Sequence, residues 1–514
     1  MNCESFGSCG SCTLGEPYED QILYKKRLIA DKFREFFDGE FEFFASQPQN
    51  YRIRAEFGIW HDIWHSASDL AYTMGGARSK KILINECPKV ALPIANLMPR
   101  LLEALRRSEA LKEKLFGVEF ISCASGILAT LLYHKRLGER EQEAICELAG
   151  KLGIRVMARA RGQKLLSGEL SLTDELCVDG RVYKFRFGEN AFIQPNRGVN
   201  EKMIAWARSC VDFGKEGTSE VRAAQNFIAE NSAAQNYGCE QSAAQNSTDR
   251  NFASENSAEF DAACRNSVKA NFARAEFSGE NSAKFNRASA CESSTDENFT
   301  RKDLDAQNSA TKNLDCEKQG LQNSASEKLI AQNSSHEQSA AQNSSCEKYA
   351  VRPESSAARD LLELYCGHGN FTIPLAAKFN RVLASEISKS SIANARINCE
   401  LNGVCNAQFV RLSADELMSA FARRREFERL KGIDIFSYDF SHVLIDPPRA
   451  GLEPSVIDFI KNFQNLIYIS CNPQTLFENL RSLCDTHEVR RFAIFDQFAH
   501  TEHIECGVLL RRRS

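Results

Sequence analysis

The C-terminal third of the chain alternates between short apolar runs and longer segments of helical periodicity. The apolar runs fit buried strands and lie at residues 361–364, 381–385, 407–412, 442–445 and 466–469. Residues 490–495 and 505–510 follow them as a candidate antiparallel pair. This βα rhythm predicts an α/β fold with a doubly wound, Rossmann-like sheet.

The N-terminal part of the chain has a different pattern. Residues 51–61 alternate between apolar and polar side chains, which is typical of a half-buried antiparallel strand. Further strands are predicted at 116–120 and 127–134, and helices at 20–37, 96–111 and 139–153. In the second of these helices we expect Pro99 to lie in the first turn, where proline is tolerated. Because a βαβ rhythm is lacking, the pattern indicates a small α+β domain.

From about residue 214 to about residue 357 the composition changes sharply. This segment is mostly Ala, Ser, Asn, Gln and Glu, and Ala-Ala-Gln-Asn recurs at 223, 233, 243 and 340. Few aliphatic residues are present to offset the ordering entropy, so we predict a disordered or loosely helical insertion. A solenoid is the alternative, but its repeats would need regular apolar positions. The predicted regions are residues 1–50, an α+β domain at 51–185, the insertion at 214–357, and the doubly wound domain at 186–213 and 358–514.

Charge and cysteine content narrow the classes of partner. The 514 residues carry a formal net charge of −4, so an RNA-binding surface would be a local patch rather than a global basic field. Arg52 and Arg54, on the polar face of the strand at 51–61, are candidates for such a patch, and a solvated face is the alternative. The chain has 19 cysteines. Its N-terminus is polar, unlike the apolar core of a signal peptide, and no apolar run is long enough to span a membrane. We therefore expect a cytoplasmic protein with reduced cysteines and no membrane partner.

Three cysteines at the N-terminus have a spacing that suits a metal site. Cys3, Cys9 and Cys12 follow a C-x5-C-x2-C pattern, and Cys87 is the candidate fourth ligand. Four thiolates predict a [4Fe-4S] cluster, with zinc as the alternative. The spacing alone is equally compatible with a frayed terminus whose thiols bind nothing.

The turn after the first strand of the doubly wound domain suits a nucleotide-like ligand. It carries Gly367 and Gly369, which allow the backbone to approach a ligand closely. Glu386 ends the second strand, where an acid can accept hydrogen bonds from two ribose hydroxyls. The spacing is shorter than a dinucleotide fingerprint and has no third glycine, which favours S-adenosyl-L-methionine over a nicotinamide dinucleotide. The alternative is an ordinary turn followed by a helix-capping acid.

Cys471 lies where a predicted strand stops, at the end of the sheet where α/β proteins place their chemistry. A buried core cysteine is the alternative, since a free thiol behaves as a small hydrophobe. The segment 446–449 (Asp-Pro-Pro-Arg) resembles the loop by which amino-methyltransferases hold a target amine. Arg449 replaces the aromatic residue of those enzymes, which favours a substrate with an oxygen-rich edge.

A thiol and a carboxylate at such a site can together methylate a uracil. A thiolate that adds to carbon 6 makes carbon 5 nucleophilic towards a methyl sulfonium, so Cys471 is the candidate nucleophile. A base must then remove the carbon-5 proton, and Glu505, at the start of a late strand, is the candidate. An ordinary strand-end carboxylate is the alternative for Glu505.

Taken together, these blocks resemble the RNA 5-methyluridine methyltransferases, and most of all the bacterial tRNA (uracil-5-)-methyltransferases. The resembling blocks are 51–62, 192–196, 361–371, 446–451, 468–473 and 495–510, and the resemblance covers nearly all of the chain except the insertion. It implies Cys471 as nucleophile, Glu505 as base and Arg449 facing the uracil. The residues that the resemblance implies for cofactor binding are Gln194, Tyr365, Gly367, Asn370, Glu386 and Asp446.

The resemblance favours tRNA over ribosomal RNA as the substrate. The ribosomal branch usually has an N-terminal oligonucleotide-binding barrel, for which we expect no room before Cys3. Residues 54–61 and 495–498 look like the tRNA branch, whereas the four cysteines match the cluster of the ribosomal branch. We expect an RNA-binding domain at 51–185 and methyl transfer to the T-loop uridine (position 54) of tRNA, without an obligate protein partner. The same reaction on ribosomal RNA and a tRNA-folding chaperone with secondary catalysis are the alternatives.

Overall fold

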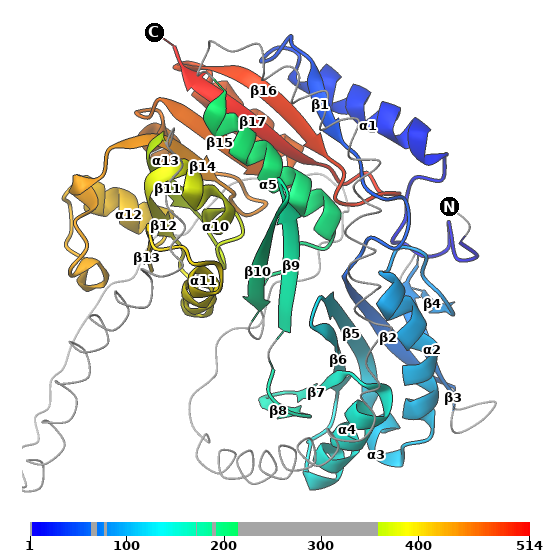
Figure 1. The fold of residues 1–514 in the computed structure, drawn as a ribbon. Coiled ribbons are helices and arrows are strands. Elements are labelled where there is room, and N and C mark those ends of the chain that lie inside the picture. The colour runs from blue at the N-terminus through cyan, green and yellow to red at the C-terminus, as the bar shows by residue number, and fades with distance from the viewer. Residues whose placement is uncertain are drawn as a thin grey trace, which may run out of the picture. The chain divides into compact units, whose positions relative to one another are not determined.

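The computed structural model of the chain describes residues 3–62, 69–76, 80–170, 172–187, 192–213 and 358–513. Figure 1 follows these stretches from the N-terminus to the C-terminus. The insertion predicted at 214–357 lies outside the described residues, so its interpretation stays a prediction.

An eight-stranded sheet forms the larger part of the described residues. Its strand order is β1-β16-β17-β15-β14-β11-β12-β13. The strands from β15 to β13 are parallel, whereas β17 is antiparallel to both β15 and β16 (Figure 1). The strands are β1 (Phe41–Phe44), β11 (Ala358–Leu364), β12 (Phe379–Ser385), β13 (Ala407–Val410), β14 (Phe440–Ile445), β15 (Asn465–Ser470), β16 (His487–Phe495) and β17 (Glu505–Arg512). The doubly wound, Rossmann-like fold and the antiparallel pair at its end are therefore confirmed.

The central strands are buried on both faces, as expected of a parallel sheet covered by helices. Leu361 belongs to the apolar cluster on one face, and Leu362 belongs to the cluster on the other. The covering helices include α10 (Thr372–Leu375), α11 (Lys389–Asn402), α12 (Ala414–Phe421), α13 (Pro454–Ile460) and α14 (Pro473–Leu483). The helical segment between β11 and β12 is short, because β12 begins at Phe379 and leaves room only for α10 and a 3-10 turn. None of the helices in the described stretches is long and apolar enough to cross a bilayer.

The N-terminal segment adds an edge strand and a helix to the large sheet. β1 runs parallel to β16, and α1 (Tyr18–Phe33) precedes it (Figure 1). Lys25 on α1 forms a 2.7 Å ion pair with Asp496, and both side chains are fully buried. Tyr18 donates a 2.7 Å hydrogen bond to the second carboxylate oxygen of Asp496. Removing one partner of such a buried pair costs about 3–5 kcal/mol, so the pair holds α1 firmly against the segment after β16.

Seven strands described between residues 54 and 166 form a second sheet with the order β4-β3-β2-β5-β6-β7-β8. All of its pairings are antiparallel except that between β6 and β7. Phe57, Ile94 and Ile145 lie in one apolar cluster, which places α2 and α4 on the same face of this sheet. The elements are β2 (Arg54–Asp62), β3 (Asp69–Gly75), β4 (Lys81–Ile84), α2 (Leu92–Arg106), α3 (Glu109–Lys112), β5 (Leu115–Cys123), β6 (Gly126–Tyr133), α4 (Glu139–Leu152), β7 (Arg155–Ala160) and β8 (Gln163–Leu166).

The helix predicted at 96–111 is wrong at both ends. α2 starts at Leu92 and ends at Arg106, and Ser108 then caps the separate α3. Pro99 therefore lies inside α2 rather than in its first turn. Pro93 is the proline that starts the helix, at a position where the missing N–H would have no partner in any case.

A hairpin follows the second sheet along the chain and contacts the turn after β11 of the large sheet. Its strands, β9 (Leu172–Val178) and β10 (Arg181–Phe187), are antiparallel, and α5 (Arg197–Asp212) follows them. The backbone N–H of Arg186 donates a 2.7 Å hydrogen bond to Asn398 on α11. Phe185 and Phe187 lie edge-on to the ring of His368, which belongs to the turn after β11. The hairpin therefore supports that turn from one side.

Candidate active site and thiol pocket

The carboxyl ends of β11 and β14 meet where the strand order reverses. From β11 the chain continues outwards through β12 and β13, and then crosses to β14 on the other side of β11. In open α/β sheets such a switch point forms a crevice that binds ligands. Tyr365, Glu386 and Asp446 directly follow β11, β12 and β14. The topology thus brings three of the predicted cofactor residues to this edge.

The turn after β11 has an open backbone. Tyr365, Gly367 and Gly369 all have positive φ, of 63°, 57° and 90°. A Cβ atom at Gly367 would meet no atom within 4 Å, so the backbone there borders free space. Positive φ is uncommon for a tyrosine, and such residues gather at ligand sites. This part of the turn is suited to a ligand that approaches the main chain.

Glu386 is hydrogen-bonded to the same turn. Its Oε2 accepts a 3.2 Å hydrogen bond from the N–H of Gly367, and its Oε1 accepts a 2.7 Å bond from the N–H of Ser388. Ser388, not Glu386, is the N-cap of α11. The carboxylate is therefore held at the strand end beside the glycine turn, where a ribose could be bound.

Residues from both sides of the insertion meet at this turn. The side chains of Asn370 and Asn200 on α5 exchange hydrogen bonds of 2.9 and 3.0 Å. Gln194, just before α5, is nearly buried and accepts a 3.4 Å hydrogen bond from Gln497. Carboxylates, amides and open backbone in one place fit a ligand that carries a ribose and an amino-acid group, as S-adenosyl-L-methionine does.

Cys471 and Glu505 face each other across two antiparallel strands. β15 ends at Ser470, which pairs with Cys506 of β17, so the next step of the ladder sets Cys471 opposite Glu505. Cys471 is half-buried rather than in the core, and burial, with the charges of Glu505 and Asp446, raises the pKa of its thiol. Burial, with a contribution from Asp446, raises the pKa of Glu505 to about 8. The site pairs a thiol with a carboxyl group that can carry a proton at neutral pH.

The loop after β14 completes this group of residues. Burial raises the pKa of Asp446 to about 7. Arg449 is exposed, and its positive charge lowers the pKa of both Cys471 and Glu505, against the effect of burial. The backbone oxygen of Arg449 accepts a 3.0 Å hydrogen bond from Asn472, which follows Cys471. The structure therefore brings the predicted Asp446, Arg449, Cys471 and Glu505 together.

Sequence reasoning missed two polar groups behind Glu505. Gln497 is fully buried, and its Nε2 donates hydrogen bonds to Gln194 at 3.4 Å and to the sulfur of Met203 at 3.0 Å. Its side chain also lowers the pKa of Glu505, against the effect of burial. Lys25 fixes Asp496, the residue before Gln497, through the buried ion pair. A signal was present, because two polar residues directly after the apolar run of β16 need buried partners. The sequence could not name those partners, which come from distant parts of the chain.

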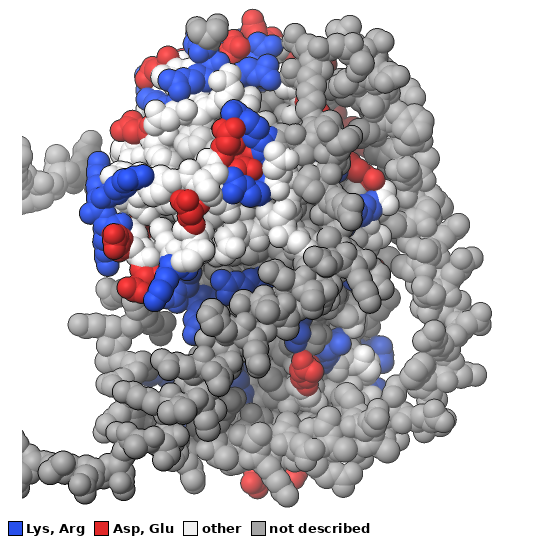
Figure 2. Space-filling view, turned by 60° about the vertical axis from the view of Figure 1, so that its left-hand side comes forward, with Lys and Arg blue, Asp and Glu red and all other residues white. Residues whose placement is uncertain are grey.

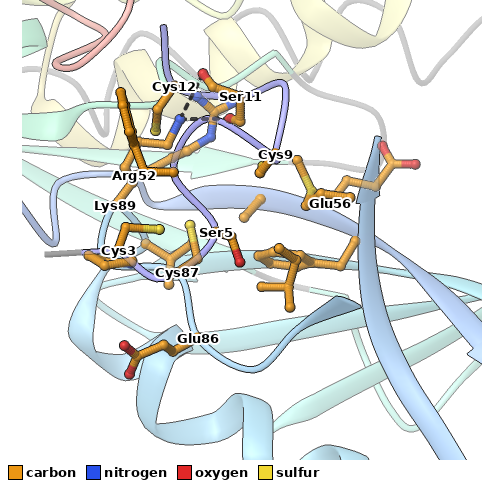
Figure 3. Close-up of a pocket in the computed structure, with 17 residues that line it drawn as sticks. Cys3, Ser5, Cys9, Ser11, Cys12, Arg52, Glu56, Glu86, Cys87 and Lys89 are labelled. Atoms are coloured by element: carbon orange, nitrogen blue, oxygen red, sulfur yellow. Dashed lines mark hydrogen bonds between the residues drawn. The ribbon is translucent and has the colours of Figure 1, made fainter. Parts of the chain in front are cut away.

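The four predicted metal ligands line one pocket of about 160 Å³ (Figure 3). Cys3, Cys9 and Cys12 come from the N-terminal loop, and Cys87 comes from the loop before α2. Figure 3 shows Cys3 beside Cys87, at one end of this group. As they are placed, no three His, Cys, Asp or Glu side chains within the described ranges could hold a metal ion. The four thiols thus line one pocket, but as placed they do not converge on a common point as the ligands of a metal would.

Burial and charge act in opposite directions on these thiols. Burial raises the pKa of both Cys12 and Cys87, and the cation of Lys89 lowers it. Lys89 is nearly buried and donates a 2.7 Å hydrogen bond to the Ser11 hydroxyl. Backbone N–H groups of Lys89 and Val90 also lower the pKa of Cys87. Thiolate is the form that binds metals, so this donor set fits a thiolate-bound metal or cluster.

Arg54 is the first residue of β2 in the second sheet, and Arg52 lies just before that strand. Arg54 forms a 2.6 Å ion pair with Glu119 and is 41% exposed. Arg52 lines the thiol pocket and lies 5.7 Å over the ring of Phe498. On the face in Figure 2, basic and acidic side chains are interspersed over the described residues. A role of these two arginines in RNA contact stays a prediction.

A family model and the curated relatives of this chain point to the same protein family. The family described as tRNA (Uracil-5-)-methyltransferase matches residues 17–227 and 314–513. The tRNA/tmRNA (uracil-C(5))-methyltransferase of Campylobacter concisus (strain 13826) is 45% identical over 514 residues, with 100% of both chains covered. The relative of the same name from Campylobacter curvus (strain 525.92) is 44% identical over 513 residues, again with 100% of both chains covered.

A solved structure supports the fold. It is that of the Pyrococcus abyssi tRNA (uracil-54, C5)-methyltransferase in complex with S-adenosyl-L-homocysteine, and it is similar to this chain with a TM-score of 0.52. The similarity covers 98% of this chain and 86% of the other, with 14% sequence identity. At this identity the likeness bears on the arrangement of strands and helices alone.

Proposed function

The chain belongs to the tRNA (uracil-5-)-methyltransferase family, and we infer that it is an S-adenosyl-L-methionine-dependent enzyme that methylates carbon 5 of uridine in tRNA. The observation that carries this proposal is the meeting of Cys471 and Glu505 at the ends of two paired strands, near the open turn of the switch point. Relatives named for this activity match the chain over their full lengths. The proposed compartment is the cytoplasm, where thiols stay reduced.

The proposed target is the T-loop uridine at position 54 of tRNA. This choice rests on residues 54–61 and 495–498, which look like the tRNA branch of the family. Because the relatives are named for tRNA and tmRNA alike, tmRNA is the second candidate substrate.

In the proposed mechanism Cys471 is the nucleophile. Its thiolate adds to carbon 6 of uracil, a sulfur–carbon bond forms, and the electron pair moves to the carbon-4 carbonyl as an enolate. The charge of Arg449 favours the thiolate. When bound, S-adenosyl-L-methionine supplies the methyl group to the nucleophilic carbon 5. The residues proposed to hold the cofactor are Gln194, Tyr365, Gly367, Asn370, Glu386 and Asp446.

Glu505 completes the proposed reaction as the base. Its carboxylate takes the carbon-5 proton, the carbon 5–carbon 6 double bond forms again, and the sulfur–carbon bond breaks to release the Cys471 thiolate. A carboxyl group with a pKa of about 8 is a stronger base than an exposed glutamate, which suits removal of a proton from carbon.

Nucleoside mass spectrometry of RNA from cells that lack the protein tests the proposed function. We expect 5-methyluridine to disappear from tRNA and to return when the wild-type chain is expressed. Loss of 5-methyluridine from ribosomal RNA instead of tRNA would show that ribosomal RNA is the substrate. Unchanged 5-methyluridine in both RNA classes would contradict the proposed reaction.

We also propose that Cys3, Cys9, Cys12 and Cys87 hold a [4Fe-4S] cluster, with zinc as the alternative. The shared pocket and the cation of Lys89 support this assignment. Methyl transfer itself moves no electron, so the proposed role is a cross-link between the N-terminal loop and the second sheet. Metal binding can replace a hydrophobic core in a short segment such as this loop.

Metal analysis after anaerobic purification tests this cluster. We expect about four irons per chain and a broad visible absorption band. Cys87→Ser should lose most of the iron, whereas Cys484→Ser, a half-buried thiol outside the pocket, should keep it. A colourless wild-type protein with neither iron nor zinc would contradict both assignments.

A further inference from the structure

The loop after β14 carries Arg449 in a tight turn that lies directly on α14. The N–H of Gly451 donates a 2.9 Å hydrogen bond to the backbone oxygen of Pro448, and Gly451 has a φ of 81°. A Cβ atom at Gly451 would lie 3.0 Å from Oδ1 of Asn479 and 3.0 Å from Cβ of Thr475, both on α14. Glycine therefore allows the loop to approach the helix more closely than a residue with a side chain would.

Asn479 is a buried polar residue on the inner face of α14, where helical periodicity would place an apolar side chain. Its neighbours on that face, Leu476 and Leu480, belong to the apolar core. Oδ1 of Asn479 accepts a 2.7 Å hydrogen bond from the hydroxyl group of Tyr468 and a 3.1 Å hydrogen bond from the backbone N–H of Leu452. The amide oxygen thus uses both of its lone pairs, one for β15 and the other for the loop.

These contacts join the loop of Arg449 to the strand that carries the nucleophile. The hydroxyl group that Asn479 binds belongs to β15, which ends directly before Cys471. Leu452 closes the same loop that begins after β14. At the start of α14, Asn472 donates a 3.0 Å hydrogen bond to the backbone oxygen of Arg449. The loop is therefore held at two points, which lie about two turns apart on one helix.

The position of Arg449 matters because its side chain is the cation that acts on the thiol. Burial and the charges of Glu505 and Asp446 raise the pKa of Cys471, and the charge of Arg449 lowers it. Such an effect weakens as the distance between the charges grows. The guanidinium group of Arg449 is exposed and has no ion pair with any other residue that the structure describes. Its place is therefore set by the backbone of the loop.

We propose that Asn479 is a positioning residue for methyl transfer: it holds Leu452 against α14 and so keeps Arg449 beside Cys471. This inference rests on the proposed function, because it assigns Asn479 to the reaction of Cys471. The amide acts through the loop and not on the reacting atoms. A leucine at position 479 would fill a similar space, but the N–H of Leu452 would lose its acceptor and the loop would lose this anchor.

A double-mutant cycle tests this role. Asn479→Leu is expected to slow single-turnover methylation of tRNA roughly 10- to 100-fold, and the double variant with Arg449→Gln should be no slower than Arg449→Gln alone. The KM for S-adenosyl-L-methionine should change less than about twofold, because two rigid prolines separate Asp446 from Arg449. Equal slowing by Asn479→Leu in both backgrounds would overturn the inference, since a purely structural loss does not depend on Arg449.

The reactivity of the thiol gives a readout that does not require turnover. Iodoacetamide alkylates the thiolate, and peptide mass spectrometry follows Cys471 separately from the other cysteines. In Asn479→Leu, alkylation of Cys471 at pH 8 should slow roughly three- to tenfold, and its pH dependence should shift to higher pH, as in Arg449→Gln. Cys484, a second half-buried thiol, is the internal reference and should not change. Unchanged reactivity of Cys471 in Asn479→Leu would overturn the inference.

Tyr468→Phe is the matched control for Asn479→Leu. It removes the other hydrogen bond of Asn479 from the same core but leaves that of Leu452 in place. This variant should keep the wild-type alkylation rate of Cys471 and the wild-type rate of single turnover. Losses as large as those of Asn479→Leu would assign the effect to core packing and overturn the inference.

Gly451→Ala reaches the same loop if Asn479→Leu does not fold. Its Cβ would push the loop away from α14, so alkylation of Cys471 should slow as in Arg449→Gln. A wild-type alkylation rate in Gly451→Ala would contradict the positioning role. Turnover of tRNA by the wild-type protein is measured in parallel, and its absence would count against the proposed function, whereas the alkylation rates test the anchor independently of that function.

Discussion

Replacing Cys471 with alanine is expected to reduce methyl transfer by at least roughly 10³-fold. The methyl sulfonium needs a nucleophilic carbon 5, and without the thiolate the uracil ring provides none. Binding of S-adenosyl-L-homocysteine should stay close to the wild-type value, because the proposed cofactor residues follow β11, β12 and β14 or precede α5, and none of them belongs to β15. Single-turnover methylation of tRNA with a labelled methyl donor, together with cofactor titration, measures both quantities.

Cys484→Ala is a suitable control for Cys471→Ala. Cys484 is also partly exposed, but it ends α14 and lies outside the site. This variant should retain wild-type turnover. Turnover above a trace in Cys471→Ala would rule out the nucleophile assignment and leave the fold assignment untouched.

Glu505→Gln is expected to trap the reaction after methyl transfer. The methyl group can still reach carbon 5, but the carbon-5 proton has no base, so the Cys471–uracil bond persists. A covalent protein–RNA species should therefore accumulate and migrate slowly on a denaturing gel. The double variant with Cys471→Ala should give no such band. Normal turnover of Glu505→Gln without a slow band would exclude Glu505 as the base.

The pKa of Glu505, raised to about 8, also predicts a pH dependence. Below that value the ionised fraction rises about tenfold per pH unit, so release of a tritium label from carbon 5 should accelerate with pH and level off above about 8. A raised pKa means that the folded state holds this proton more tightly than the unfolded state does. Stability from this group is present at low pH and is lost as the pH rises through about 8. Glu505→Gln should remove this loss, which thermal unfolding at pH 6 and pH 9 would show.

The doubly wound sheet could be predicted because its central strands are nearly continuous apolar runs. The hairpin of β9 and β10 was also detectable, since Tyr183, Phe185 and Phe187 alternate with other residues after the turn at 179–180. The pairing of β1 with β16 could not be predicted, because a four-residue strand carries too little pattern to select a distant partner.

Some residues of the candidate site could likewise be predicted from the sequence, and others could not. Cys471 and Glu505 could be proposed from the sequence, because strand ends in an α/β sheet are defined by local pattern. Gln497 could not be proposed, because its hydrogen-bond partner Gln194 lies far from it in the sequence and is brought to it only by folding. The extent of α2 was mistaken because two prolines, Pro93 and Pro99, were both compatible with a helix start.

The buried contacts between the N-terminal segment and β16 affect the order in which the chain can fold during synthesis. Arg491 on β16 pairs with Glu42 on β1, and these residues are 449 positions apart. At the usual 5–20 residues per second, the ribosome needs about 20–90 s to make the chain between them. Until then Lys25 lacks Asp496, its partner in the buried ion pair, and β1 lacks β16, the strand with which it pairs. The first part of the polypeptide to emerge is thus among the last to reach its final place, and we expect chaperones to bind it in that interval.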